Sequence, residues 1–537
     1  MASTESLSSF FCASPTIEMV DAKMRSLQCQ ASQIHDQMRQ LEEYKNTRLL
    51  IVSKLPPEVL SIILEVLALS KPPLLYDSYS RAHYRNILPA TQVCRLWRQV
   101  ALDSPRVWSY IYSSAPPRLV ELFLERARSA PLCLRSNGWA RNENILTLLD
   151  RLHQVKELNL KCNSEWWKRI TSESTPLLET LALENASGPR PASTVTFSTD
   201  AFPALRHLAL KHYICASNPT SFIPLHSLAI DCTQVMKGEL PNPIDFFSAL
   251  NDLPHLSSLT LTNALAQPTG PPPSLSINLP SLTDLSIADD DIRNIGLMAC
   301  ITAPRIETIT LCCNAEQEME PERSAAIVAD IYLKLPDLTH TQCQFVLAIG
   351  THPYARVRAW TKRPENNQDS IPPLFDFKVP GTSDLRLEES VLTLFPPTTV
   401  PPILNFSSNA TTFSDDDYTV PRQRILRQLM DVTEVHANRL MDLALIMCDT
   451  PTKRGQTTMS LPSWKTMVFH DSFYSIKYKS RILGRLKKQL KARKTVNAPI
   501  ETWQLDSMSL SATDLEQFQD LVDCVSQKPH GLSSWRY

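Results

Sequence analysis

Glycine is scarce in this chain, with 10 glycines among 537 residues, whereas 41 residues are proline. A loop that cradles a phosphate group needs clustered glycines, because its backbone N–H groups must approach the ligand closely. The sequence contains no such cluster. Nucleotide chemistry on a glycine-rich loop is therefore not expected.

Long apolar runs are also missing. No stretch approaches the roughly 18 apolar residues that would span a bilayer, and the N-terminal MASTESLSSFFCASP lacks the basic start and the apolar stretch of a secretory signal. The 13 cysteines are odd in number and dispersed, which fits free thiols in a reducing compartment better than a disulfide framework. We expect an intracellular protein, cytoplasmic or nuclear or both, without a membrane partner.

The chain also lacks an excess of charge of either sign. It has 54 basic and 55 acidic residues, which give a net charge of -1. This balance argues against a protein whose whole surface binds nucleic acid. The contents of 43% hydrophobic and 20% charged residues are typical of a globular protein. The length allows about two to four domains of roughly 150 residues.

Two segments are predicted at the N-terminus. Residues 1–16 are rich in serine and threonine and are expected to be a disordered tail. Residues 17–48 are expected to form a coiled-coil-like helix, because apolar residues recur there at alternating steps of three and four. The seam consists of Ile17, Val20, Met24, Leu27, Ala31, Ile34, Met38 and Leu41. The chain could associate with a second copy between Ile17 and Leu41, or the helix could pack along the next module.

Residues 50–112 are predicted to form a helical module. Pro56 and Pro57 suit a helix start, where the first N–H groups have no intrahelical partner, and Glu58 places a negative charge in the first turn. Apolar residues then recur at helical spacing in two stripes. They are Val59, Leu60, Ile63, Leu64, Leu67 and Ala68, and Val93, Leu96, Trp97, Val100 and Ala101. A module this small cannot cover so much apolar surface by itself, so a partner is expected.

Two patterns in this module point to a family. The pattern L-P-x-E-[IVL]-L-x-x-I lies on residues 55–63, and V-C-x-x-W-R-x-[IVL]-A followed by P-x-[LV]-W lies on residues 93–108. In both, the chain resembles the F-box, the helical motif by which substrate receptors attach to the Skp adaptor of SCF-type (cullin–RING) ubiquitin ligases. The resemblance implies adaptor contacts by Leu55, Pro56, Glu58, Val59, Leu60, Ile63, Val93, Cys94, Trp97, Ala101, Pro105 and Trp108. An inserted loop at about 70–86 replaces the short turn usual in the family. An ordinary pair of amphipathic core helices is the alternative.

Internal repetition follows a segment expected to be helical from 116 to about 150. The pattern L-x-x-L-x-L, with Val or Ile at some of its positions, starts at residues 155, 178, 205, 225, 256, 282 and 306, and every unit but the first has a proline just upstream. Positions i, i+3 and i+5 do not share a helix face, whereas the last two share a strand face. This spacing is that of leucine-rich repeats, whose units bury their leucines by stacking. A leucine-rich-repeat-like array is predicted over residues 116–335.

The residues between the leucines are predicted to form the outer face of these strands. We expect this face to bind a partner protein. The candidate residues are Glu157, Asn159, Lys161, Thr180, Glu184, His207, Lys211, Asp231, Thr260, Asp284 and Thr308.

Residues 336–537 are predicted to be divergent repeats with insertions. Possible strands lie at 338–345 and 356–360, a linker at about 372–417, and a helix at 425–448. Two late units recur at residues 464–469 and 500–505. A closing helix is expected to include Leu515, Phe518, Leu521, Val522 and Val525.

Catalytic or metal-binding residues do not form a recognisable set. His207 and His212 lack a third ligand, and Cys312 and Cys313 are adjacent instead of spaced as in a zinc site. We expect no enzyme, no cofactor and no metal. The basic run from Lys477 to Lys494 carries an apolar stripe of Ile482, Leu483, Leu486 and Leu490. It is interpreted as the exposed face of a packed helix, with an import signal or a patch for an anionic partner as alternatives.

The predicted fold class is α+β, with an α/β solenoid: an N-terminal helix and the F-box, then the repeat array with divergent C-terminal units. The arrangement resembles the F-box-like proteins of mushroom-forming fungi. It implies a substrate receptor that binds a Skp-type adaptor, through it a cullin, and an unknown protein substrate. The alternatives are a non-ligase leucine-rich-repeat scaffold and a nuclear protein that uses the basic run to bind nucleic acid, although the balanced charge does not favour a nucleic-acid partner.

Overall fold

The structure is a computed structural model, and it divides the chain into two compact units, Met1–Lys161 and Cys162–Tyr537. The described residues are 16–49, 54–69, 84–135, 142–173, 175–185, 193–195, 201–215, 225–233, 235–267, 276–314, 326–331, 342–349, 354–360, 373–380, 392, 402–408, 419–437, 442, 446, 461–469, 479–505, 513 and 516–527. The expected disordered tail, except for Thr16, and most of the inserted loop at 70–86 lie outside these ranges.

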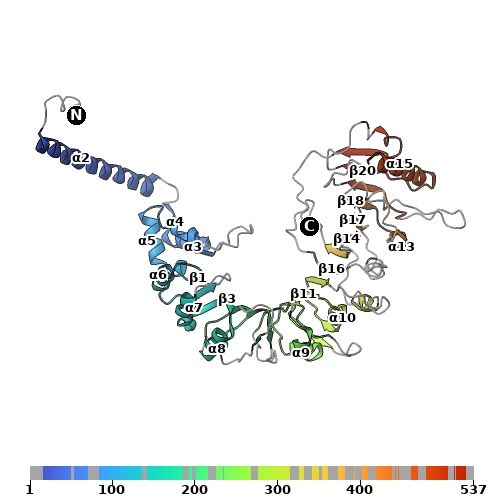
Figure 1. Cartoon of the computed structure of the whole chain (residues 1–537), viewed down its shortest axis with the longest axis horizontal. Helices are drawn as coiled ribbons and strands as arrows, with labels where there is room; N and C mark the ends of the chain where they lie inside the picture. Colours follow the sequence, from blue (N-terminus) through green and yellow to red (C-terminus); the bar gives the residue numbers. More distant parts are fainter. Residues whose placement is uncertain are drawn as a thin grey trace. The chain divides into compact units, whose positions relative to one another are not determined.

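A long helix, α2 (Ile17–Tyr44), opens unit 1 (Figure 1). Thr16 caps it, because its hydroxyl oxygen accepts a hydrogen bond from the Met19 N–H at 3.4 Å. A short π-helix, η1 (Lys45–Leu49), follows. None of the residues of α2 is buried. The predicted helix is confirmed, whereas its pairing with another chain stays a prediction.

Short helices and strands follow in unit 1. They are α3 (Pro57–Leu69), α4 (Tyr84–Ala90), α5 (Arg95–Asp103), the 3-10 turn η3 (Pro105–Trp108), β1 (Tyr110–Tyr112), α6 (Pro117–Ala127), β2 (Leu132–Arg135), α7 (Asn142–Leu149), η4 (Leu152–Gln154) and β3 (Val155–Cys162). The strands β1, β2 and β3 pair in parallel. The segment 116–150 was expected to be wholly helical, and β2 corrects that expectation. A run as short as Leu132-Cys133-Leu134 has no helical or strand period of its own, so its pairing with β1 and β3 decides its structure.

Unit 2 begins with parallel strands that follow the repeated pattern. They are β4 (Thr180–Asn185), β6 (His207–Lys211), β8 (Ser227–Asp231), β9 (Ser258–Thr262), β11 (Asp284–Asp289) and β13 (Thr308–Cys313). Each pairs with the next in that order, and the fourth residue of each unit aligns across the sheet. The aligned residues are Leu181, Leu208, Leu228, Leu259, Leu285 and Ile309. The strands predicted from the pattern are present.

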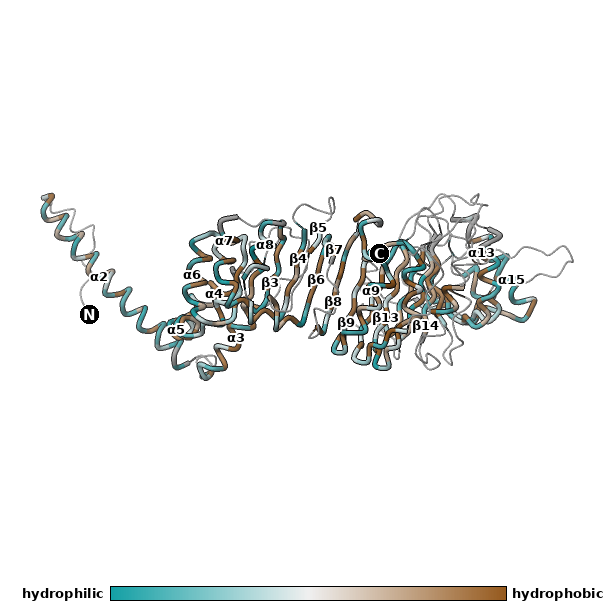
Figure 2. Tube along the Cα trace, turned by 90° about the horizontal axis from the view of Figure 1, so that it is seen from below, coloured by the Kyte–Doolittle hydropathy of each residue, from teal (hydrophilic) through white to brown (hydrophobic). Residues whose placement is uncertain are grey.

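Burial alternates along these strands as the pattern requires. In β4, Leu181 and Leu183 are buried, whereas Thr180, Ala182 and Glu184 are only partly covered. The other strands repeat this arrangement, and apolar and polar residues alternate along the tube in Figure 2. Since side chains at successive strand positions point to opposite faces, the leucines form one continuous core layer.

The connections between these strands are irregular. They include α8 (Ser164–Ser172), α9 (Pro243–Leu250), α10 (Ile292–Gly296), η6 (Lys237–Glu239) and η7 (Leu297–Cys300), and two small sheets. The small sheets pair β5 (Ser193–Val195) with β7 (Tyr213–Cys215), and β10 (Ile277–Asn278) with β12 (Ile301–Thr302). Within the described residues, one strand-to-strand connection does not resemble the next. The fold is a mixed α/β arrangement with a large, mostly parallel sheet, and the predicted solenoid of leucine-rich repeats is not confirmed.

Beyond β13 the sheet changes its order. The strand β16 (Phe375–Pro380) pairs in parallel with β13, and β15 (Tyr354–Trp360) is antiparallel to both β16 and β14 (Gln342–Ile349). Parallel pairing resumes from β14 through β17 (Ile403–Ser408), β18 (Glu434–Ala437), β19 (Thr466–Phe469), β20 (Thr502–Leu505) and β21 (Cys524–Gln527). Two helices, α13 (Thr419–Gln428) and α15 (Lys479–Thr495), accompany these strands. The late units at 464–469 and 500–505 are confirmed as strands.

Three expectations about this part of the chain were wrong. The linker expected at 372–417 contains β16 and β17, the helix expected at 425–448 gives way to β18, and the expected closing helix contains β21. Proline, serine and threonine suggested loops. However, short apolar sets such as Phe375, Phe377 and Val379 are buried, because they add strands to an existing sheet.

Candidate functional site

The helix α3 is apolar on two opposite sides. Leu60, Leu64 and Ala68, four residues apart, face the interior and are buried. A second stripe, here called the outer stripe, is formed by Val59, Ile62, Val66 and Leu69. These side chains are 41%, 59%, 57% and 41% exposed. The helix therefore offers solvent the kind of apolar surface that usually marks an interaction site.

The inner side of α3 packs on a core that Trp108 anchors. The Trp108 side chain is fully buried, and its ring N–H donates a hydrogen bond to the carbonyl oxygen of Ala101 at 2.7 Å. Its ring meets that of Phe123 edge to face at 5.1 Å, and the Arg126 guanidinium lies 4.3 Å from the ring centroid. These contacts join η3 to α5 and α6, and they give α3 a fixed support.

A hydroxyl pair also ties α3 to the end of α5. The Ser61 hydroxyl donates to the Ser104 oxygen at 2.8 Å, and the Ser104 hydroxyl donates to the Val100 carbonyl oxygen at 2.7 Å. On the surface, Arg95 of α5 pairs with Glu43 of α2 at 2.9 Å. The hydroxyl contacts fix α3 against α5, so the outer stripe keeps one orientation within the module.

The adaptor contacts implied by the sequence fall into three groups. Exposed residues are Pro56, Glu58, Val59 and Val93. Partly buried residues are Leu55, Ile63, Cys94, Trp97 and Pro105. Leu60, Ala101 and Trp108 are buried in the module's own core, so direct contact with a partner is not open to them in this conformation. Those three belong to the core on which α3 packs, and adaptor contact by the others stays a prediction.

Sequence reasoning missed Ile62, Val66 and Leu69, which belong to the outer stripe. The signal was present, because the polar residues of the segment PEVLSIILEVLAL are confined to Glu58, Ser61 and Glu65. These three residues, spaced three and four apart, form one narrow polar side, and a helix that is apolar over the rest of its surface is normally covered over most of that surface. The alternative of an ordinary pair of core helices does not account for this second apolar stripe.

The predicted partner-binding residues of unit 2 do lie on one face of the sheet. Thr180, Glu184, His207, Lys211, Asp231, Thr260, Asp284 and Thr308 are all exposed or partly exposed. Three rows run across the strands in register. The first holds Thr180, His207, Ser227, Ser258, Asp284 and Thr308; the second Ala182, Ala209, Ala229, Thr260, Ser286 and Thr310; the third Glu184, Lys211, Asp231, Thr262, Ala288 and Cys312. The rows form a surface of mostly small or polar side chains, and partner binding by it stays a prediction.

The three candidates on β3 belong to unit 1. Asn159 is exposed, and Glu157 and Lys161 are partly exposed. The Glu157 carboxylate lies 3.4 Å from the Arg135 guanidinium of β2. Glu157 is therefore already part of an ion pair, which would have to rearrange if a partner bound this carboxylate.

Two buried thiols near this strand are not activated. Burial, together with the nearby Glu157 carboxylate, raises the pKa of Cys133 to about 12. Burial also raises the pKa of Cys162 to about 12. Because the thiolate is the nucleophilic form, neither cysteine offers nucleophilic chemistry at neutral pH.

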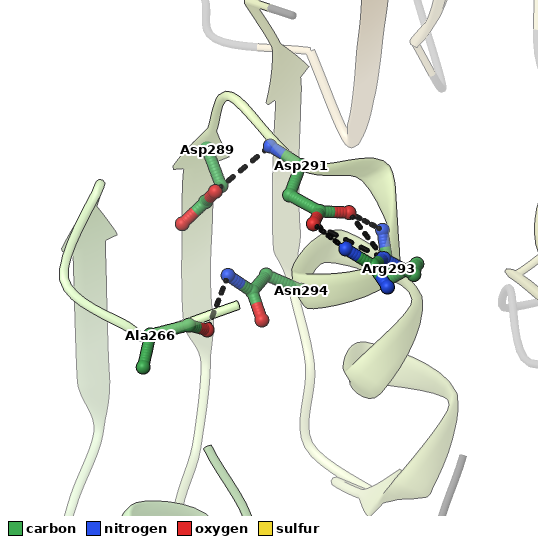
Figure 3. Close-up of polar contacts among 5 residues, drawn as sticks. All are labelled: Ala266, Asp289, Asp291, Arg293 and Asn294. Atoms are coloured by element: carbon green, nitrogen blue, oxygen red, sulfur yellow. Dashed lines mark hydrogen bonds and ion pairs between the residues drawn. The ribbon is translucent and has the colours of Figure 1, made fainter. Parts of the chain in front are cut away.

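A polar cluster at the end of β11 has a structural role. Asp289 accepts the N–H of Asp291 at 2.9 Å, and Asp291 both caps α10 and pairs with the Arg293 guanidinium at 2.6 Å. The Asn294 amide donates to the Ala266 carbonyl oxygen at 3.2 Å. Figure 3 shows the Asn294 oxygen pointing away from Asp289, so these oxygens do not converge on a cation.

The predicted basic helix is present as α15. Leu483, Leu486 and Leu490 are buried as expected, but so is Arg493, which was expected in solvent. The Arg493 guanidinium donates to the Leu461 carbonyl oxygen at 2.7 Å and lies 5.3 Å from the Trp464 ring centroid. A cation with carbonyl and aromatic partners can be buried, which a charge count along the sequence does not reveal.

Histidines meet across the strands of unit 2. The rings of His207 and His226 lie 6.4 Å apart, and those of His226 and His255 lie 6.0 Å apart. His212 lies beyond the end of β6 and is not part of this row. Within the described ranges, no group of three or more His, Cys, Asp or Glu residues is arranged to hold a metal ion.

Among the helices in the described ranges, none has the length and apolar character needed to cross a membrane.

Comparison with known proteins identifies one domain. Residues 52–114 match the family model described as F-box-like. The matched residues include α3 with its outer stripe, α5, and η3 with Trp108. No curated protein matches the chain. The leucine-rich-repeat prediction and the resemblance to proteins of mushroom-forming fungi therefore stay predictions.

Proposed function

We propose that this protein is a substrate receptor of an SCF-type cullin–RING ubiquitin ligase. Its F-box-like domain would dock on a Skp-type adaptor, through which a cullin is recruited, and the outer sheet face would bind the protein to be ubiquitinated. F-box-like domains generally bind such adaptors, and the match of residues 52–114 to that family model supports the proposal. The observation that carries the proposal is the outer stripe of α3.

The outer stripe suits docking on energetic grounds. Four apolar side chains project from one rigid helix, and burial of each half-exposed side chain contributes about 1 kcal/mol. Helix-in-groove recognition uses anchors at spacings of three and four, and Val59, Ile62, Val66 and Leu69 have these spacings. Together these residues would supply much of the binding energy of a stable complex.

The test is adaptor binding by Ile62→Glu/Val66→Glu, measured by co-purification and by titration of the purified proteins. Both positions are exposed, so the variant should fold normally while its affinity for the adaptor falls at least about tenfold. The matched control is Leu146→Glu on α7, which places the same charge at a residue of the same unit that is 45% exposed. The control should bind like the wild type.

Two outcomes would decide against parts of this function. If the wild type recovers no Skp-type adaptor, adaptor docking is lost and a non-ligase interaction scaffold becomes the better function. If the adaptor binds but no cullin follows in the purified assembly, the ligase role fails and adaptor docking stands. In either function, we propose that the protein works without catalytic chemistry of its own and acts inside the cell, in the cytoplasm, the nucleus or both.

Self-association through α2 is a further part of this proposal. The seam residues Ile17, Leu27, Ile34 and Leu41 are each at least 41% exposed. Their alternating spacing of three and four is that of a coiled-coil seam, and pairing with a second copy would bury them. Light scattering during size-exclusion chromatography should then give a dimer mass. A monomer mass at micromolar concentration would contradict self-association through α2.

A further inference from the structure

A cationic cluster lies on the outer face of the sheet where its order changes. Arg356 and Arg358 project from β15, and Asp376 and Lys378 project from β16. The strand pairing sets Arg356 opposite Lys378 and Arg358 opposite Asp376. Thr310 and Cys312 of β13 align with Asp376 and Lys378. The cluster thus continues the second and third rows of the polar sheet face.

The Asp376 carboxylate pairs with both arginines. Both oxygens of Asp376 accept from the Arg356 guanidinium, with Nε to Oδ1 at 2.6 Å, and the Arg358 Nε lies 3.6 Å from Oδ2. The Lys378 ammonium lies 4.9 Å from the Tyr354 ring centroid and, within the described residues, has no carboxylate partner. The Lys378 ammonium therefore adds a positive charge that no carboxylate of the described residues offsets by an ion pair.

The neighbouring thiol does not offset this charge. Burial raises the pKa of Cys312 above the ordinary value of a thiol, although Lys378 and Arg356 act in the opposite direction. The thiol therefore stays neutral at pH 7. Asp376 is itself largely covered, with 8% of its side chain exposed, so a ligand would meet the cations before it met the carboxylate.

Like charges directly opposite one another on neighbouring strands destabilise a sheet. Arg356 and Lys378 form such a pair, and their strands are held in register by the buried Val357 and Phe377 beneath them. The repulsion cannot be relieved by a change of register, since a slip of one residue would bring the charges inward. An external anion between the two cations would relieve it.

We propose that Arg356, Arg358 and Lys378 bind the anionic side chain of an extended, acidic segment of a partner protein. This inference goes beyond adaptor docking and does not depend on it, because the cluster lies wholly in unit 2. Charge-assisted hydrogen bonds from guanidinium and ammonium groups suit a carboxylate or a phosphate. Both groups occur on peptide segments, so the experiment separates them.

The surrounding face favours a peptide over a nucleic acid. Asp231 and Asp284 project from the same face, and Asp284 accepts the Thr308 hydroxyl at 2.6 Å. A polyphosphate backbone laid along the sheet would meet these carboxylates, whereas a peptide can present an acidic residue only where the cations are. Hydroxyl groups on Thr260, Ser286 and Thr310 can bond to a peptide backbone beside the cluster.

The experiment measures binding of short fluorescent peptides to the full chain by anisotropy. The probes are a polyglutamate peptide, a phosphoserine-containing peptide and a polyglutamine peptide of equal length. The glutamate or phosphoserine probe should bind, and Lys378→Gln should weaken that binding about 3–10-fold, as expected for one lost charge contact at a partly covered site. The tighter of the two acidic probes identifies carboxylate or phosphate as the preferred anion.

Lys465→Gln is the matched control, because Lys465 is an exposed lysine of unit 2 outside the candidate partner-binding residues, and it pairs with Glu501 at 2.9 Å. It should leave peptide affinity within about twofold. Neither lysine is buried, so thermal unfolding of both variants should match the wild type.

Three results would overturn the inference. The acidic probes could bind no more tightly than polyglutamine, or the two lysine variants could lose affinity equally. Alternatively, a single-stranded DNA oligonucleotide could bind more tightly than either acidic peptide and lose affinity in Lys378→Gln, which would make nucleic acid the occupant. Adaptor binding by the same preparations reports separately on the F-box-like domain.

Discussion

The helix α3 and the strands of unit 2 are both rich in leucine, isoleucine and valine, yet they leave different surfaces. In the strands, each leucine lies inside and each neighbour outside is small or polar. In α3, the inner stripe is buried while Ile62 and Val66 of the outer stripe remain more than half exposed. The leucines of the strands are buried within the chain. The outer stripe of α3 is apolar and exposed, so burying it would require a partner.

The largest expected effect concerns the support beneath α3. Trp108→Ala should lower the free energy of unfolding by about 3–5 kcal/mol, because it removes a buried ring, its hydrogen bond to Ala101 and its contact with Phe123. Trp97→Ala should cost only about 1–2 kcal/mol, since Trp97 is partly exposed. Chemical denaturation of both variants checks this order. Equal costs would mean that Trp97 contributes as much to the core as Trp108.

Truncating a side chain should cost more stability on the core face of the sheet than on its outer face. Leu261→Ala should cost about 2–4 kcal/mol, because Leu261 lies in the core layer. Thr260→Ala, one residue away on the outer face, should stay within about 0.5 kcal/mol. Denaturant unfolding of the pair measures the difference. If Thr260→Ala were as costly as Leu261→Ala, the outer face would be covered and unavailable to a partner.

The smallest effect appears in alkaline solution and concerns unit 1. Burial raises the pKa of Cys133 from 9.0 to about 12 and that of Tyr110 from 10.0 to about 12. Below pH 9 both states of the chain keep these protons. As the pH rises toward 12, the unfolded state releases them while the folded state retains them, so stability falls.

Unfolding measured between pH 9 and 12 tests this linkage. Cys133→Ala should make the decline shallower by up to about 1.4 kcal/mol per pH unit, which is the limit for one proton. Cys29→Ala on the exposed face of α2 is the control and should leave the slope unchanged. An identical slope in Cys133→Ala would show that this thiol ionises as readily in the folded chain as in the unfolded one.

Local sequence pattern predicted the repeat strands and the helix α3 because the period of the apolar residues is enough to identify each. It failed at β16, β17, β18 and β21, where four to six residues are too few for an apolar period to be distinguished from chance, and pairing with the sheet decides the structure. It also misplaced Arg493, whose burial depends on the Leu461 carbonyl oxygen and the Trp464 ring, 32 and 29 residues away. Contacts at that sequence separation are decided by packing.

The sequence pattern likewise predicted only part of the candidate docking site. The proline start and the paired patterns at 55–63 and 93–108 located the F-box-like domain that the family comparison identifies. The pattern could not say which apolar stripe of α3 faces out, because both stripes consist of the same residue types. The burial of Leu60, Ala101 and Trp108 emerged only when α5, η3 and α6 were placed around them.

By itself, then, the sequence determined which residues alternate between core and surface, since that follows from the periods of helix and strand. The tertiary structure alone decided the order of the strands. It placed β16 beside β13 and folded β15 back against β16, which brings Arg356 and Arg358 next to Lys378. Strand order depends on hydrogen bonds between distant segments, and no local pattern encodes them. The physical consequence is a cluster of three cations on a sheet face that elsewhere carries carboxylates such as Asp231 and Asp284.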